Sequence, residues 1–172
     1  PASVGLAVLA GPLLSTLFQY GEFRGGDVRM ASLSLMAYAV GLSGFIFVKI
    51  LAPGYFSRQD TRTPVRIGII AMVANIVFNL MLVFSLAHVG LALATGLSAM
   101  LNAALLYAGL RRDKVYMPRE GWMRFNLAII AASIVMGGAV GFMAGPLDGW
   151  LSATLIERAV HLTALVVGGA AC

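Results

Sequence analysis

The sequence predicts an all-α integral membrane protein with six transmembrane helices, the last of them incomplete. Hydrophobic residues make up 60% of the chain and charged residues 11%, against about 25% charged residues in a typical soluble domain. The charges are also clustered, so that residues 1–21, 30–48, 67–110 and 125–147 carry none. Each of these stretches is long enough to cross a bilayer, which takes about 20 helical residues.

The net charge of +5 is better explained as an orientation signal than as a nucleic-acid footprint. Basic residues gather at the ends of the apolar stretches, without interleaved aromatic residues and without a soluble domain to carry them. We therefore expect no nucleic-acid partner. Cys172, His88 and His161 each stand alone in the sequence, so that we expect neither a metal site nor a cofactor.

The first two apolar stretches predict helices over residues 2–20 and 30–56. Gly11-Pro12 predicts a kink in the first helix, and Pro53-Gly54 predicts an interruption or kink near the end of the second. The segment 22–29 between them has balanced charges and does not reveal its side of the membrane.

The uncharged stretch 67–110 is too long for one span and predicts a hairpin of two helices. We expect these helices at 67–87 and 89–110, with the break at 87–90. Asn75 and Asn79 are i,i+4 partners on the first of them. The second carries a polar sector that comprises Thr95, Ser98, Asn102 and Gly109. Because amides in lipid need partners, both polar faces should point inward.

A basic loop at 113–124 precedes a fifth helix at 125–147, and a sixth helix is expected after Arg158. The segment 148–158 is slightly acidic and suits the outer side. A cytoplasmic start with six spans places the basic loops after the second and fourth helices inside the cell. The residues expected to set this topology are Arg58, Arg62, Arg66, Arg111, Arg112, Lys114, Arg119 and Arg124.

The chain starts at Pro1 without a basic leader region and ends within the apolar run 159–172, which is too short to span. We therefore expect an internal portion of a longer membrane protein.

The segment from Lys49 to Arg66, KILAPGYFSRQDTRTPVR, resembles the corresponding segment of the MurJ (MviN) lipid II flippases. Residues 17–23, 88–98 and 102–112 agree with that family as well, and the resemblance covers essentially the whole chain.

The resemblance implies a fourteen-helix protein of the multidrug/oligosaccharidyl-lipid/polysaccharide exporter superfamily. Residues 1–112 would form helices of its C-terminal lobe, and residues 125–172 two additional C-terminal helices. The implied activity is transport of the undecaprenyl-linked peptidoglycan precursor, lipid II, across the bacterial cytoplasmic membrane by alternating access. The implied partners are lipid II, membrane lipids and the missing N-terminal lobe of the same chain. The family's best-known functional arginines lie outside this sequence.

A polar headgroup cannot cross about 30 Å of hydrocarbon unaided, so a flippase needs a polar cavity beside an apolar groove. The candidates for the cavity wall are Lys49, Ser34, Tyr38, Asn75, Asn79 and Asn102. Lys49 lies near the cytoplasmic end, where snorkelling to the interface is the alternative to substrate contact. The asparagines have the alternative role of interhelical hydrogen-bond partners.

A glycine ridge on the fifth helix is formed by Gly137, Gly141 and Gly145 at four-residue spacing. Such a ridge favours close helix packing, with accommodation of the lipid tail as the alternative.

Three other classes of function stay open from the residues alone. A polysaccharide-lipid exporter or a drug/cation antiporter would share the superfamily fold, but an antiporter is disfavoured because no acid falls in mid-span. An intramembrane enzyme would need paired carboxylates, a His-Glu-x-x-His helix or a nucleophile with its base, and the sequence has no such set, so we expect no enzymatic activity. A non-transport membrane scaffold is the remaining alternative.

Overall fold

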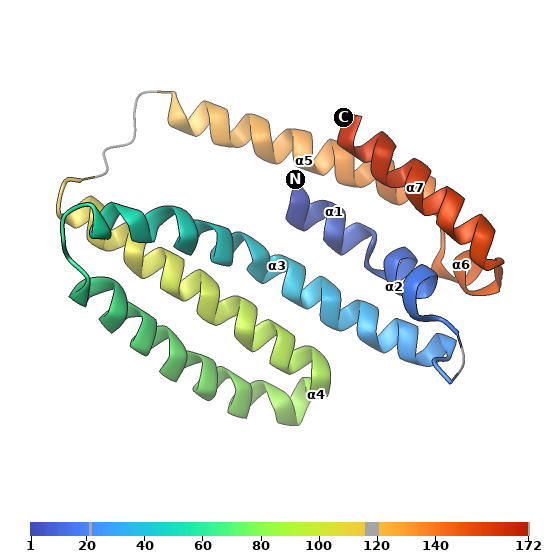
Figure 1. Cartoon of the computed structure of the whole chain (residues 1–172), viewed down its shortest axis with the longest axis horizontal. Coiled ribbons are helices and arrows are strands. Elements are labelled where there is room, and N and C mark those ends of the chain that lie inside the picture. Colours follow the sequence, from blue (N-terminus) through green and yellow to red (C-terminus); the bar gives the residue numbers. More distant parts are fainter. Residues whose placement is uncertain (21, 116–120, 172) are drawn as a thin grey trace. The chain divides into compact units, whose positions relative to one another are not determined.

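The computed structural model describes residues 1–20, 22–115 and 121–171, and at 85, 87, 170 and 171 it describes the backbone only. The described residues form α-helices joined by short connections, which confirms the all-α prediction (Figure 1). Within the described residues, four helical segments are long and apolar enough to cross a membrane: Gly25–Phe56, Arg62–Phe84, His88–Arg112 and Trp122–Ala144.

The chain divides into two compact units. The first comprises Pro1–Met36 and Met123–Cys172, and the second comprises Ala37–Trp122. In the first unit a core of Leu9, Val140, Ala144, Trp150 and Leu165 joins helices that are distant in sequence. In the second, the corresponding core comprises Tyr55, Ile67, Leu106 and Leu110.

The expected first helix is interrupted earlier than its sequence suggested. Helix α1 covers Ala2–Val8 and helix α2 covers Ala10–Phe18, with the break at Leu9. The kink was expected at Gly11-Pro12. A proline ring clashes with the carbonyl of the residue four positions earlier, here Val8, and this places the break one turn before the proline.

Helix α3 covers Gly25–Phe56 and so begins five residues before the expected start at Met30. The backbone N–H of Arg24 donates to the Asp27 carboxylate at 2.9 Å, and an acid in the first turn suits the positive end of the helix. The expected interruption at Pro53 is absent, because the helix continues through this residue to Phe56.

Helix α4 covers Arg62–Arg112 and turns back on itself within the second unit, as Figure 1 shows. Its two candidate spans end at Phe84 and begin again at His88, close to the expected break. The helix begins five residues before the expected start because Pro64 lies in its first turn, where a missing N–H costs nothing.

The C-terminal part of the chain differs most from expectation. Helix α5 covers Trp122–Ala144, so the expected end at Leu147 is three residues too late. Residues 148–158 were expected as an outer loop, but helix α6 covers Leu147–Ser152 and helix α7 covers Leu155–Ala171. Helix α7 begins early because Thr154 and Glu157 form a capping box: the Thr154 N–H and hydroxyl donate to the Glu157 carboxylate, each at 2.9 Å.

Candidate functional site

A polar network connects the two arms of the α4 hairpin. The Asn75 amide donates to the Ser98 hydroxyl at 3.1 Å, and the Asn79 amide donates to the Asn75 carbonyl oxygen at 2.9 Å. Ser98 in turn donates to the backbone carbonyl of Thr95 at 2.9 Å. The hairpin therefore brings together polar residues that the sequence placed on two separate helices.

This network borders a pocket of about 340 Å³ in the second unit. Its lining residues are Phe45, Val48, Gly68, Ala71, Met72, Asn75, Thr95, Ser98, Ala99 and Asn102, all uncharged. The buried side-chain oxygens Asn79 Oδ1 and Asn102 Oδ1 have no hydrogen-bond partner among the described residues. Since most buried polar atoms are paired, these two oxygens can accept hydrogen bonds from a hydroxyl, an amide or water.

The pocket is held in place by a close crossing of helix α3 over the second arm of α4. A Cβ at Gly41 would collide with the backbone of Gly96, and a Cβ at Gly44 would lie 2.7 Å from the Met100 nitrogen. Only glycine permits such an approach of two backbones. Gly41 therefore faces the second arm of α4.

The three cavity candidates on α3, Ser34, Tyr38 and Lys49, are not among the residues that line the pocket. Phe45 and Val48 of α3 line it, while Lys49 is an exposed residue outside the lining. Tyr38 is exposed and packs near Phe45 with ring centroids 5.7 Å apart. Ser34 belongs to the first unit and donates to the Met30 carbonyl of its own helix.

The basic residues expected to set topology are exposed where the structure describes them. In the second unit these are Arg58, Arg62, Arg66, Arg111, Arg112 and Lys114; Arg124 belongs to the first unit, and Arg119 lies outside the described residues. Arg58 forms an ion pair with Asp113 at 3.1 Å, which ties the turn after α3 to the residue that follows α4. Hydrogen bonds from the Thr63 hydroxyl and backbone N–H lower the pKa of the Asp60 carboxyl.

The three ridge glycines have different surroundings. A Cβ at Gly137 would lie 2.5 Å from Val4 Cγ1, and one at Gly141 would lie 3.4 Å from Val8 Cγ1, so both face α1. Gly145 is not part of the ridge, because it follows the end of α5 with a φ of +67° that favours glycine. An apolar pocket of about 420 Å³ lies among α1, α2, α5 and α7, lined in part by Gly5, Met136 and Gly169.

Arg158 is a buried residue that sequence reasoning placed in a loop. Only 7% of its surface is exposed, and its guanidinium donates to the backbone carbonyls of Ser15 and Leu151, each at 3.0 Å. The capping box that starts α7 was readable as a Thr-x-x-Glu pattern and would have placed Arg158 inside a helix. Within the described part of the chain, no three His, Cys, Asp or Glu residues come close enough to hold a metal ion.

Comparison with known proteins gives one consistent result. The family model "Lipid II flippase MurJ" matches residues 1–160. A probable lipid II flippase MurJ of Vibrio cholerae is 49% identical over 99% of this chain, and one of Haemophilus influenzae is 47% identical over 97%. The lipid II flippase MurJ of Burkholderia cenocepacia is 38% identical over 97% of this chain.

The chain spans about a third of the length of these relatives, 33%, 32% and 33% respectively. The extent of the family match, together with apolar helices of membrane-spanning length, identifies the chain as part of a multi-pass membrane protein that belongs to the lipid II flippase MurJ family.

Proposed function

We propose that the protein containing this chain transports an undecaprenyl-linked peptidoglycan precursor from the inner to the outer leaflet of the bacterial cytoplasmic membrane. The observation that carries this proposal is the family match over residues 1–160. The protein would act as a transporter without covalent catalysis. The chain would work together with the rest of its own protein, since it spans only a third of its relatives.

Each of the two units supplies one of the surfaces that such transport needs. The uncharged polar pocket beside the α4 network would contact hydroxyl and amide groups of the headgroup, with Asn102, which lines the pocket, as an acceptor. The apolar pocket lined by α1, α2, α5 and α7 would accept part of the prenyl tail. Both assignments follow from matching polarity, because an unpaired polar group in hydrocarbon is costly.

The proposed orientation follows from the basic loops. Arg58 and Lys114 would lie on the cytoplasmic side, and Asp148 on the outer side. Lys49 would then lie near the cytoplasmic interface, where its charge is available to a phosphate but can also snorkel.

Asn102 allows the substrate role to be separated from a packing role. Its unpartnered Oδ1 contributes no hydrogen bond within the described residues, so Asn102→Leu should leave folding intact. If the oxygen binds the headgroup, loss of that bond should reduce transport roughly fivefold to tenfold. Asn75→Leu breaks the bond to Ser98 and should lower folded yield as well.

The test is complementation of a bacterial strain depleted of its own flippase, using the full-length gene and checking protein level by immunoblot. Leu97→Ala, an exposed position on the same helix, is the matched control and should complement fully. Lys49→Met should insert normally, and it should reduce transport about ten- to a hundredfold if the lysine binds phosphate. Failure of the unmodified gene to complement would refute the proposed function. Full growth of Asn102→Leu would refute the assigned headgroup contact.

A further inference from the structure

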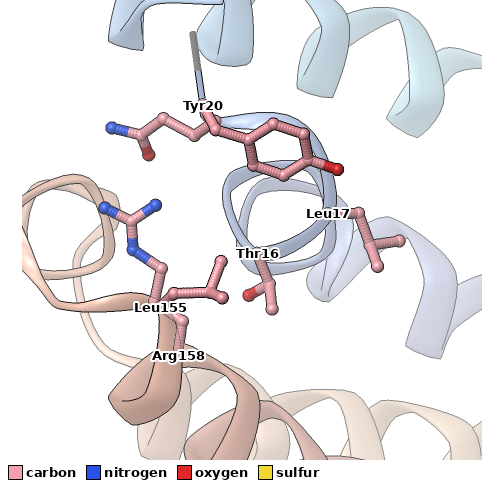
Figure 2. A pocket seen from close by; sticks show the side chains of 6 residues that line it. Thr16, Leu17, Tyr20, Leu155 and Arg158 are labelled. Carbon is pink, nitrogen blue, oxygen red and sulfur yellow. The ribbon is translucent and has the colours of Figure 1, made fainter.

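Arg158 lies at the edge of a pocket of about 680 Å³ in the first unit. The pocket is lined by Thr16, Leu17, Gln19, Tyr20, Leu155 and Arg158. Figure 2 shows the Arg158 side chain extending from α7, while Thr16, Leu17 and Tyr20 come from the end of α2 and the residues after it. An arginine that is 7% exposed is uncommon unless its charge is paired.

The described partners of this guanidinium are neutral. Its two Nη atoms donate to the backbone carbonyls of Ser15 and Leu151, near the C-terminal ends of α2 and α6. Such carbonyls carry only partial negative charge. The third donor, Nε, is buried without a partner among the described residues.

Nearby acids are engaged elsewhere. Asp148 forms an exposed ion pair with Arg29, and Glu157 accepts hydrogen bonds from Thr154 at the start of α7. No carboxylate in the described part of the first unit forms an ion pair with Arg158. Because arginine is always protonated, its full positive charge lacks a counter-charge from these residues.

The pocket also offers an acceptor. Gln19 donates through Nε2 to the Leu151 carbonyl at 3.1 Å, which fixes its amide, and Gln19 Oε1 is then buried without a partner in the described residues. A suitable ligand therefore combines an anionic oxygen for Nε with a hydroxyl donor for Oε1. Phosphate esters of a polyol have this combination, and Leu17 and Leu155 add an apolar rim suited to a lipid.

We propose that the Arg158 pocket binds the phosphate of a lipid headgroup, with an adjacent headgroup hydroxyl donating to Gln19. In the orientation proposed above, the pocket opens toward the outer leaflet. Two lipids share this chemistry: an anionic glycerophospholipid and the sugar-bearing prenyl diphosphate. Binding at this site does not require the proposed transport activity, because a glycerophospholipid is present in the membrane whether or not the protein transports the prenyl diphosphate.

The experiment measures binding to the full-length protein in neutral detergent by thermal stabilisation. The probes are phosphatidylglycerol, phosphatidylcholine, the sugar-bearing prenyl diphosphate lipid II and inorganic phosphate. Arg158→Gln removes the charge, but it also weakens the contacts to Ser15 and Leu151 and could impair folding. Leu155→Glu avoids this problem: it places a carboxylate one turn from Arg158, at an exposed position in the first turn of α7, and supplies an internal counter-charge.

Saturable stabilisation by phosphatidylglycerol or by the prenyl diphosphate is expected for the wild type, and the response to each identifies the source of the phosphate. The apparent Kd should rise about tenfold or more in Arg158→Gln and in Leu155→Glu. Leu155→Glu should keep or raise the Tm without lipid, and Arg124→Gln, an exposed control in the same unit, should bind as the wild type does. Equal binding by the wild type and Leu155→Glu would overturn the proposal. Stabilisation by inorganic phosphate alone, or equally by phosphatidylcholine, would also overturn it.

Discussion

Tyr55 and Gly109 form a contact whose energetics can be separated by a double-mutant cycle. Tyr55 is 1% exposed, and its hydroxyl donates to the Leu106 carbonyl at 2.8 Å. A Cβ at Gly109 would collide with this hydroxyl but would lie 3.4 Å from Tyr55 Cζ, an ordinary contact distance. The phenol oxygen therefore occupies the space that a side chain at position 109 would fill.

Three variants follow from this geometry. Gly109→Ala should destabilise the protein by about 1–3 kcal/mol through overpacking. Tyr55→Phe removes one hydrogen bond and should cost about 1 kcal/mol. In the double variant the alanine methyl enters the space left by the oxygen and gains about 0.5–1 kcal/mol from replacing a helical glycine. The double variant should therefore be close to wild type in stability, with a coupling energy of about 1.5–4 kcal/mol.

The assay is unfolding of the purified full-length protein in detergent, with the free energy of unfolding measured for all four proteins. The control variant is Gly68→Ala on the same helix. Its added Cβ has no neighbour within 4 Å, so it reports only the stability gained by replacing a helical glycine with alanine. If the double variant is destabilised by the sum of the two single effects, Tyr55 and Gly109 are not in contact and the reasoning fails.

Three further predictions concern packing, pH and topology. Gly137→Leu should lower the yield of folded protein while Gly138→Leu should not, because only the former places a Cβ against Val4; equal yields would refute the α1–α5 contact. Since the folded-state pKa of Asp60 is lowered, its stabilisation is present above the ordinary pKa of 3.8 and is lost as the pH falls through the lower value. The stability advantage of the wild type over Asp60→Asn should therefore shrink on acidification, and a constant difference in unfolding midpoint would contradict this. Single cysteines at Thr61 and Lys114 should be shielded from an impermeant thiol reagent in intact cells while one at Asp148 is labelled, and labelling at Thr61 would reverse the orientation.

Features that depend on nearby residues were predictable from the sequence. The hairpin in residues 67–110 follows from the length of the uncharged run, and the Asn75–Asn79 hydrogen bond follows from their i,i+4 spacing. Helical character follows in the same way from composition and the clustering of charge.

Features that depend on tertiary contacts were not predictable. Periodicity could not show that the second arm of α4 would cover the face of α3 that carries Gly41. The break lies at Leu9 because Pro12 clashes with the turn before it, and the sequence motif alone did not give that position. Arg158 can be buried because carbonyls of α2 and α6 accept its hydrogen bonds. Ser15 and Leu151 accept from Arg158 only because folding brings these helices to α7.

The pairing of buried polar atoms separates structural from functional candidates in this chain. Tyr55, Ser133 and Trp150 are buried and donate to backbone carbonyls at 2.8, 2.7 and 2.8 Å, as side chains do when they stabilise packing. In contrast, Asn79, Asn102, Gln19 and Arg158 each keep one buried polar atom without a partner in the described residues. Bulk water does not reach such atoms inside a membrane protein, and a polar atom buried without a hydrogen bond is costly. These atoms therefore need a ligand or ordered water. Asn79 belongs to the α4 network, Asn102 lines the pocket beside it, and Gln19 and Arg158 line the Arg158 pocket. We therefore assign ligand binding to these two pockets and a packing role to the glycine contacts.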